Sequence, residues 1–405
     1  MKKSLSKMTM VLALLIATIV VLGISGIALA AGKPEKLVFG VIADMTGPYA
    51  PVTGPANAAM MDVAEYINET GGIRGVPLEV VVRDSAGKGD MGVNIYMQMR
   101  EMKPRPSMIY VLISGVCEAL KERFNEDQMP GLCTSNTEVV YPPSYVFGSF
   151  VTYADECGLF LDWLAETWQE KRSPKLAFLT WDTTLGKGVL YDEVFNHAKS
   201  RGIEVVGVEL FGVRDVDVTN QLMRLRAKGA DWIFTNSLSQ GPVAIAKTAK
   251  QMGYKVGIAG AALDDSCLII DRSAMEEAVA LHTYANWSET GNRGVQLMNK
   301  YFERNKRKPT YRTYMYPMGF TAILLFKEIV GRVVDKYGWD QLNGPMIKKE
   351  LESLRDFNAE DIGIFSYTPD RHSTEMAKVL QAKGGKLIPV TNFRKCPDLR
   401  PARYR

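Results

Sequence analysis

Short apolar runs alternate with segments of helical periodicity along most of the chain. Leu37–Ala43 and Leu78–Val82 are rich in aliphatic and β-branched residues, as expected of buried strands. Ala56–Asn68 and Asn94–Met102, which follow them, have the spacing of helices. Repeated strand–helix units of this kind predict an α/β fold with parallel strands.

One stretch, Ile109–Thr137, combines two such strands with polar loops. An apolar strand leads to a loop at Ser114, a helix follows, and Pro130 precedes a second short strand. The second strand is followed by Ser135, Asn136 and Thr137. Ligands of open parallel sheets bind outside the carboxyl ends of the strands. We therefore expect a small-molecule site here that involves no covalent chemistry.

A second series of strand–helix units follows the first. Its predicted strands are Tyr145–Val151, Leu176–Trp181, Ile203–Leu210, Trp232–Thr235 and Val256–Ala259, and its predicted helices are Asp155–Glu170, Gly188–Arg201, Asn220–Lys228 and Pro242–Met252. The pattern then changes to helices at 294–305 and 317–337, short strands at 363–367 and 386–390, and a basic, irregular end, 394–405, which we expect to be mobile. Two series in 405 residues predict two domains.

Polar loops recur after the predicted strands of both series. Besides the two loops named above, they contain Thr183-Thr184, Asn236-Ser237-Ser239 and Asp264-Asp265. Hydroxyl and amide donors, together with the N-terminal end of a helix, bind carboxylates or amides. Loops are generally polar, but recurrence at one structural position favours a binding site.

The N-terminus has the features of an export signal. Lys2, Lys3 and Lys7 precede an uncharged apolar stretch, and Ala28-Leu29-Ala30 fits a signal-peptidase site, so residues 1–30 are predicted to be a signal peptide. The stretch is also long enough for an uncleaved membrane anchor. Without these three lysines, 46 of the 49 basic residues remain against 45 acidic ones. This near-neutral balance gives no indication of nucleic-acid binding.

The sequence provides little support for catalysis, a metal or a cofactor. The three histidines are far apart, and no P-loop or nucleophile elbow is present. The glycines of Gly87–Gly92 match GxGxxG but follow the second strand, so we interpret them as a surface turn. The odd number of cysteines allows at most two disulfides, and Cys117 with Cys133 is the first pair to test. The five cysteines are Cys117, Cys133, Cys157, Cys267 and Cys396.

Several motifs together resemble a known family. They are Phe39-Gly40-Val41 leading to Met45–Tyr49, Ile67-Asn68 with Gly71-Gly72-Ile73 and Gly75, Arg83-Asp84, Asp182 with Gly186, and Lys247–Gly253 with Tyr254-Lys255. With these motifs the chain resembles the periplasmic solute-binding proteins of the Leu/Ile/Val-binding type, the type I family of ABC importers. The resemblance covers essentially all of the chain after the leader.

The resemblance implies two doubly wound parallel-sheet lobes joined by a three-segment hinge, the type I periplasmic binding fold. One lobe would comprise residues 34–150 with 284–355, and the other 151–283 with 356–405. The lobes would close on an amino acid or related carboxylate or amide. The implied protein is a non-enzymatic periplasmic monomer that delivers its ligand to a membrane permease.

The resemblance also assigns roles to individual residues. Ser114 would hold the ligand carboxylate, Thr137 would bind both the carboxylate and the ammonium, and Ser135 would supply a backbone carbonyl. Asp264 would face a ligand ammonium from the other lobe, near Asn236. Tyr153 and Trp181 would form the cleft wall, which favours an aromatic or branched carboxylate.

The chain departs from the family pattern at Leu185, Glu118 and Cys133, where the family commonly has tyrosine, small or hydroxyl residues, and serine. Two other functions stay open. A sensory ligand-binding domain would keep its N-terminal anchor, and a small-amide hydrolase would use Cys117 or Ser114 as its nucleophile.

Overall fold

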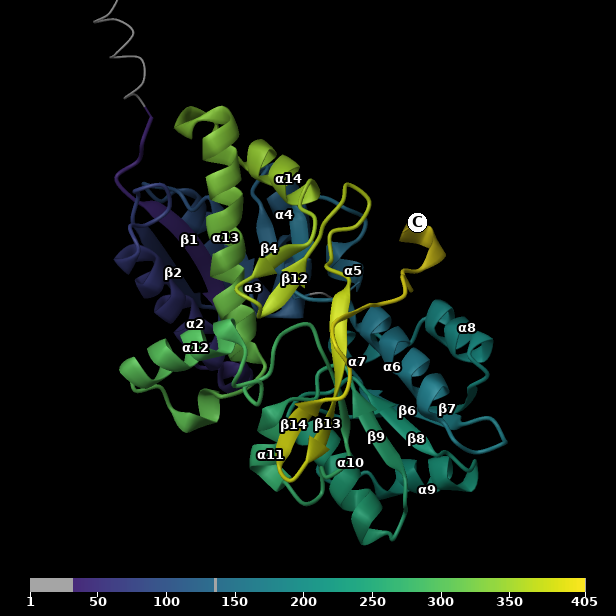
Figure 1. The fold of residues 1–405 in the computed structure, drawn as a ribbon. Coiled ribbons are helices and arrows are strands. Elements are labelled where there is room, and N and C mark those ends of the chain that lie inside the picture. Colours follow the sequence, from purple (N-terminus) through teal and green to yellow (C-terminus); the bar gives the residue numbers. More distant parts are fainter. Residues whose placement is uncertain (1–31, 135–136, 405) are drawn as a thin grey trace, which may run out of the picture.

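The computed structural model describes residues 32–134 and 137–404, apart from the side chain of Thr137, and contains two large open sheets (Figure 1). The first sheet is parallel throughout, with the strand order β2-β1-β3-β4-β5. Its strands are β1 (Leu37–Ala43), β2 (Leu78–Asp84), β3 (Met108–Val111), β4 (Gly131–Cys133) and β5 (Val146–Gly148).

Helices cover both faces of the first sheet. Strand β1 is buried along its whole length, and its alternate residues enter two different cores. Phe39 and Val41 pack with α2 and α13, whereas Val38 and Ile42 pack with α3 and α4. These helices are α2 (Ala50–Glu69), α3 (Gly89–Arg100), α4 (Ser114–Glu126) and α13 (Met315–Tyr337).

The second sheet has the order β14-β13-β10-β9-β8-β6-β7, with β15 paired to β13. Strands β6 to β10 are parallel, and β13, β14 and β15 add antiparallel pairs. The strands are β6 (Lys175–Trp181), β7 (Glu204–Phe211), β8 (Trp232–Thr235), β9 (Gly257–Gly260), β10 (Val279–His282), β13 (Met376–Lys383), β14 (Lys386–Pro389) and β15 (Arg394–Lys395).

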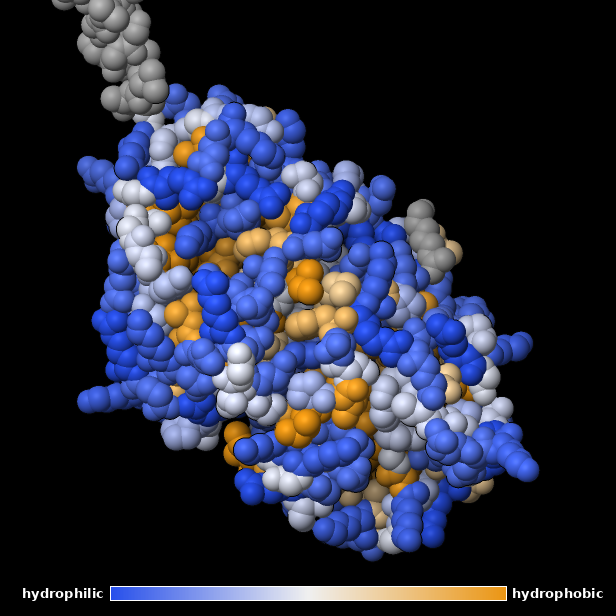
Figure 2. All heavy atoms as spheres, viewed as in Figure 1, coloured by the Kyte–Doolittle hydropathy of each residue, from blue (hydrophilic) through white to orange (hydrophobic). Residues whose placement is uncertain are grey.

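The second sheet is also covered on both faces. In β6, Phe178 packs in the core that contains α6 and α8, and Leu179 packs in the core that contains α9, α10 and α11. The helices are α6 (Tyr153–Thr167), α7 (Thr184–Lys187), α8 (Asp192–Ser200), α9 (Thr219–Ala227), α10 (Gln240–Gln251) and α11 (Asp265–Asp271). The face shown in Figure 2 is accordingly mostly hydrophilic, with hydrophobic residues visible in separate patches.

The chain passes between the two sheets three times. It leaves the first sheet after β5, leaves the second after β10, and enters the second again after the hairpin of β11 (Phe357–Ala359) and β12 (Gly363–Phe365). The second passage leads to α12 (Arg293–Arg304), α13 and α14 (Gly344–Glu352). The prediction of two α/β lobes joined by three segments is thereby confirmed.

Buried hydrogen bonds join the three passages to each other. The Tyr284 hydroxyl donates to the Ser149 carbonyl, and the Tyr367 hydroxyl donates to the Gly148 carbonyl at 2.8 Å. The Val151 amide donates to Thr283 Oγ1 at 3.1 Å. Each passage therefore contributes a polar group to one shared, buried contact region.

Some elements differ from the sequence expectation. The helix expected at 188–201 is α8 and begins only at Asp192, and the short helix α7 before it, α11, α14 and β13 were not predicted. The glycine motif at Gly87–Gly92 is not wholly a turn, since α3 begins at Gly89.

The C-terminal segment, expected to be mobile, packs against α6. Its strand β15 pairs with β13, Cys396 is buried, and the Leu399 amide donates to Asp155 Oδ1 at 2.7 Å. The apolar residues in this segment are too few to form a periodic pattern, so the sequence did not reveal the packing.

No helix among the described residues is long and apolar enough to span a membrane. The predicted signal peptide, residues 1–30, lies outside those residues.

Candidate functional site

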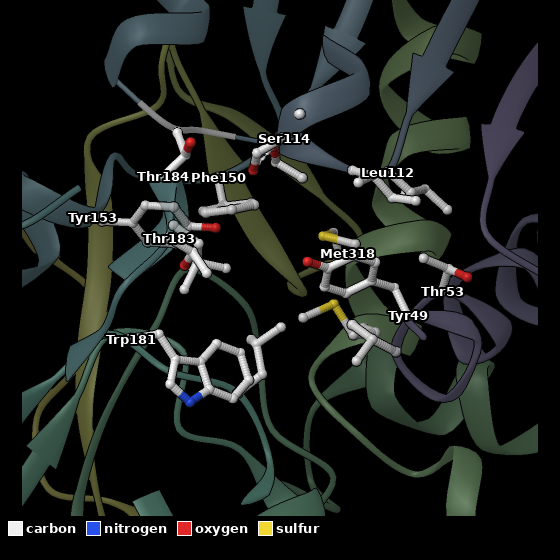
Figure 3. A pocket seen from close by; sticks show the side chains of 17 residues that line it. Tyr49, Thr53, Leu112, Ser114, Phe150, Tyr153, Trp181, Thr183, Thr184 and Met318 are labelled. Carbon is white, nitrogen blue, oxygen red and sulfur yellow. Dashed lines mark hydrogen bonds between the residues drawn. The ribbon is translucent and has the colours of Figure 1, made fainter. Parts of the chain in front are cut away.

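A cavity of about 190 Å³ lies where the carboxyl ends of strands from both sheets approach each other (Figure 3). Its lining residues come from the ends of strands of both sheets, from the loops that follow them, and from the first turns of α2, α4, α6, α7 and α13. They are Tyr49, Val52, Thr53, Leu112, Ile113, Ser114, Gly115, Thr134, Phe150, Tyr153, Trp181, Thr183, Thr184, Leu185, Leu238, Met315 and Met318. Pockets for drug-sized molecules have volumes of about 300–1,000 Å³. The cavity therefore suits a small ligand.

The first sheet contributes the polar side of the cavity. Ser114 is the first residue of α4, directly after β3, and its Oγ lies 2.8 Å from Thr134 Oγ1 after β4. The first amides of a helix have no partner within the helix, and they favour negative charge. The two hydroxyls and the N-terminal end of α4 can therefore receive a carboxylate.

Tyr49 reaches the cavity from the loop after β1. The buried Asp44 side chain shapes this loop, because its Oδ2 accepts a hydrogen bond from the Tyr49 amide at 2.8 Å and its Oδ1 accepts one from the Gly47 amide. Val52 and Thr53, in the first turn of α2, extend the same wall.

The second sheet contributes Trp181 and the first residues of α7. Trp181 is the last residue of β6 and is 8% exposed. Thr183 caps α7 by accepting a hydrogen bond from the Gly186 amide at 3.1 Å, which positions Thr184 and Leu185 at the cavity.

Aromatic and thioether side chains complete the walls. Phe150 lies in the passage after β5, and its ring centroid is 5.4 Å from that of Tyr153 in the first turn of α6. Burial raises the pKa of Tyr153 above its ordinary range, so its hydroxyl stays protonated. Met315 and Met318 come from the start of α13.

The structure places the predicted site residues in different surroundings. Ser114, Tyr153 and Trp181 line the cavity together. Ser135, Asn136 and the side chain of Thr137 lie outside the described residues.

Asn236 lies beneath the cavity wall. It is fully buried at the end of β8, and its Nδ2 donates to the Leu185 carbonyl at 2.6 Å. Its side chain therefore holds the backbone of a lining residue and is not itself among the lining residues.

Asp264 caps α11. Its Oδ1 accepts a hydrogen bond from the Ser266 amide at 3.0 Å, and burial raises the pKa of the carboxyl group. The neighbouring Asp265 accepts a hydrogen bond from Asn286 Nδ2 at 2.8 Å. Neither carboxylate is among the residues that line the cavity.

Apart from Ser114, the cysteine and histidine side chains considered for catalysis have hydrogen-bond partners away from the cavity lining. The buried Cys117 thiol donates to the Val111 carbonyl at 3.3 Å, and all five cysteines are free. His197 contacts Asp162, His282 contacts the Leu263 carbonyl, and His372 contacts the Val146 carbonyl and Glu352. Within the described ranges, no cluster of histidine, cysteine and acidic residues could hold a metal ion.

Glu118, one turn after Ser114, does not line the cavity. Burial raises the pKa of its carboxyl group, and the nearby Glu138 raises it further. Both effects favour the neutral form of Glu118.

Sequence reasoning missed the apolar half of the cavity. Phe150 falls in the strand predicted at 145–151, Leu238 lies among polar loop residues, and Met315 and Met318 lie some 200 residues after Ser114 in sequence. The helix predicted at 317–337 begins beside the two methionines, but its pattern does not place them at the cavity.

The family profile and the similar proteins agree on one family. A family profile described as periplasmic binding protein matches residues 36–386. The Leu/Ile/Val-binding protein homolog 4 of Brucella abortus (strain 2308) is 22% identical over 382 residues, which cover 89% of this chain and 86% of that protein. The corresponding protein of Brucella suis biovar 1 (strain 1330) has the same identity and coverage.

Solved structures share the fold. A branched chain amino acid ABC transporter protein from Thermus thermophilus, with bound valine, has a TM-score of 0.81 at 20% identity, covering 91% of this chain and 98% of that chain. A solute binding protein from Rhodopseudomonas palustris BisB5, in complex with 3,4-dihydroxy benzoic acid, has a TM-score of 0.74 at 16% identity, covering 90% and 99%. On the match over residues 36–386, this chain belongs to the periplasmic binding protein family.

Proposed function

We propose that this protein is the exported solute-binding component of an ABC importer and binds a small amino acid or related carboxylate or amide between its two sheets. One observation carries the proposal. The N-terminal end of α4, with the Ser114 and Thr134 hydroxyls 2.8 Å apart, faces a cavity that strand ends of both sheets enclose. Such donors form charge-assisted hydrogen bonds with a carboxylate.

The relatives support this function. The family is one of transport binding proteins and not of enzymes, and two of the solved structures hold valine and 3,4-dihydroxy benzoic acid, both of which contain a carboxyl group. Binding without catalysis or a cofactor agrees with the engaged Cys117 thiol.

Ligand binding would couple to closure of two lobes. We assign residues 34–150 with 284–355 to one lobe and 151–283 with 356–405 to the other. Because Ser114 and Trp181 belong to different sheets, a ligand that contacts both stabilises the closed form relative to the open form. The three passages between the sheets would act as the hinge.

The cellular setting follows from the leader and the family. We propose cleavage after Ala30, a periplasmic location, and a monomer that docks on a membrane permease and binds no nucleic acid. The basic n-region, the small-x-small site and the balanced charge of the remaining chain support these assignments.

Thermal-shift screening of the purified protein against amino acids, short-chain and aromatic acids, amides and neutral sugars tests the function. A ligand that binds only the folded state raises the melting temperature as its concentration increases. We expect hits among carboxylates or amides. Stabilisation by sugars alone, or turnover of a hit, would contradict the proposal.

A further inference from the structure

The side chains that line the cavity in the described part of the chain carry no formal charge. Among the described residues, all seventeen lining positions are aromatic, aliphatic, thioether, hydroxyl or glycine residues. The carboxylates in neighbouring loops have partners of their own, since Asp264 accepts from Ser266 and Asp265 accepts from Asn286. The second-sheet side of the cavity therefore presents Trp181, Leu185 and Leu238 instead of an acid.

A further acid, Glu156, also fails to serve as a counter-ion. It follows Tyr153 by three residues in α6, is 1% exposed, and does not line the cavity. Its Oε1 accepts a hydrogen bond from Thr283 Oγ1 at 3.2 Å, and burial raises the pKa of its carboxyl group well above the ordinary value. Burial thus favours the neutral form of Glu156, and its position outside the lining residues keeps it from pairing with a cation in the cavity.

The two ends of an amino acid would thus meet unequal surroundings. A carboxylate at the α4 N-terminus gains amide and hydroxyl donors. An ammonium buried in the same cavity gives up its hydration and finds no opposite charge among the lining residues that the structure describes, which is strongly unfavourable.

We propose that the cavity selects a carboxylic acid that has an apolar, branched or aromatic body and no ammonium group. The inference rests on the function proposed above and narrows its ligand class. The carboxylate lies at Ser114 and Thr134, and the body packs against Trp181, Phe150 and Met318 (Figure 3). The apolar walls of the second sheet thereby act as the element that rejects amino acids.

Calorimetric titration of the purified protein with matched pairs tests this inference. The pairs are leucine with 4-methylpentanoate and phenylalanine with 3-phenylpropionate, which differ only in the α-ammonium group. We expect the acid without ammonium to bind at least ~100-fold more tightly, because the amino acid must bury an ammonium charge that has no partner.

The possible results distinguish a failure of the inferred ligand class from a failure of the proposed function. If the amino acid of a pair binds as tightly as its partner or more tightly, the ligand class is wrong and the carboxylate-binding function stands. If a trimethylammonium carboxylate such as betaine binds best, the aromatic rings act as a cation cage, and the inference is likewise wrong. If amides bind and no carboxylate does, the ligand class is wrong, and if neither binds, the proposed function itself fails.

Two variants at one position give a second test. Leu238→Asp supplies the missing acid on the second-sheet side, and Leu238→Asn adds a side chain of the same size without charge. We expect Leu238→Asp, and not Leu238→Asn, to shift the preference at least ~10-fold towards the amino acid. An unchanged preference in a Leu238→Asp protein that melts cooperatively would contradict the inference.

Discussion

Replacement of Arg371 by alanine is predicted to destabilise the protein strongly. Arg371 Nη2 lies 2.8 Å from Asp155 Oδ2, and the two side chains are 10% and 0% exposed. Asp155 Oδ1 also accepts the Leu399 amide at 2.7 Å, so the pair joins the third passage to α6 and the C-terminal segment. Loss of the guanidinium leaves a buried carboxylate without its cation.

The free energy of unfolding is expected to fall by about 3–5 kcal/mol, which is the range for removing one partner of a buried ion pair. Burial raises the pKa of Asp155 even with Arg371 present, because desolvation outweighs the attraction. The variant is therefore expected to take up a proton at Asp155 more readily, so its stability deficit should be smaller at pH 5 than at pH 8.

Urea unfolding followed by circular dichroism measures the effect. Asp155→Asn, alone and combined with Arg371→Ala, tests the coupling, and the double variant should be more stable than the sum of the single changes predicts. Arg74→Ala is the matched control, because its ion pair with Asp335 is 51% exposed on both sides and should contribute at most about 1 kcal/mol. A cost for Arg371→Ala no greater than that of Arg74→Ala would refute the reasoning.

Three further predictions concern the site and its surroundings. Thr134→Val keeps the side-chain shape but removes the hydroxyl beside Ser114, so carboxylate affinity measured by calorimetry should fall ~10-fold with little change in melting temperature. Asp44→Ala leaves the Tyr49 amide without its acceptor. It should weaken ligand binding and lower the free energy of unfolding by about 1–3 kcal/mol. Full affinity in this variant would show that Asp44 does not hold the Tyr49 loop. Burial, and then the Asp264 charge, raises the pKa of Asp265 to about 7, so the folded state holds a proton that the unfolded state releases near pH 4. The stability from this group is complete below about pH 4 and is lost as pH rises towards 7, and urea midpoints should decline less between pH 5 and 8 in Asp265→Asn than in the parent.

The sequence predicted the fold well where burial alone determines the pattern. Strand β1 was predicted at its observed bounds because both of its faces are buried, which gives a continuous apolar run. The C-terminal segment was mispredicted because mainly polar contacts hold it, among them the β15–β13 pairing, the Arg394–Glu166 ion pair and the Leu399 amide on Asp155. Such contacts leave no periodic apolar signal.

The candidate site was predictable only in part. Ser114 and Asn236 both follow strands, yet one side chain lines the cavity and the other bonds to the Leu185 backbone. A polar residue that caps a helix, as Asp264 does, looks the same in sequence as one that faces a ligand. The contribution of Met318 depends on how α13 packs across the first sheet, which local sequence does not encode.

A small carboxylate is proposed to bind between the two sheets, with its charged group at the α4 N-terminus. The most direct test is calorimetric titration of the best thermal-shift hit into the parent, Ser114→Ala, Trp181→Ala and Ser200→Ala, the last an exposed serine on α8 outside the cavity. Ser114→Ala and Trp181→Ala, one on each side, should each weaken binding at least ~10-fold, and Ser200→Ala should bind as the parent does. Parent-like affinity in either Ser114→Ala or Trp181→Ala would contradict a site shared by both sheets.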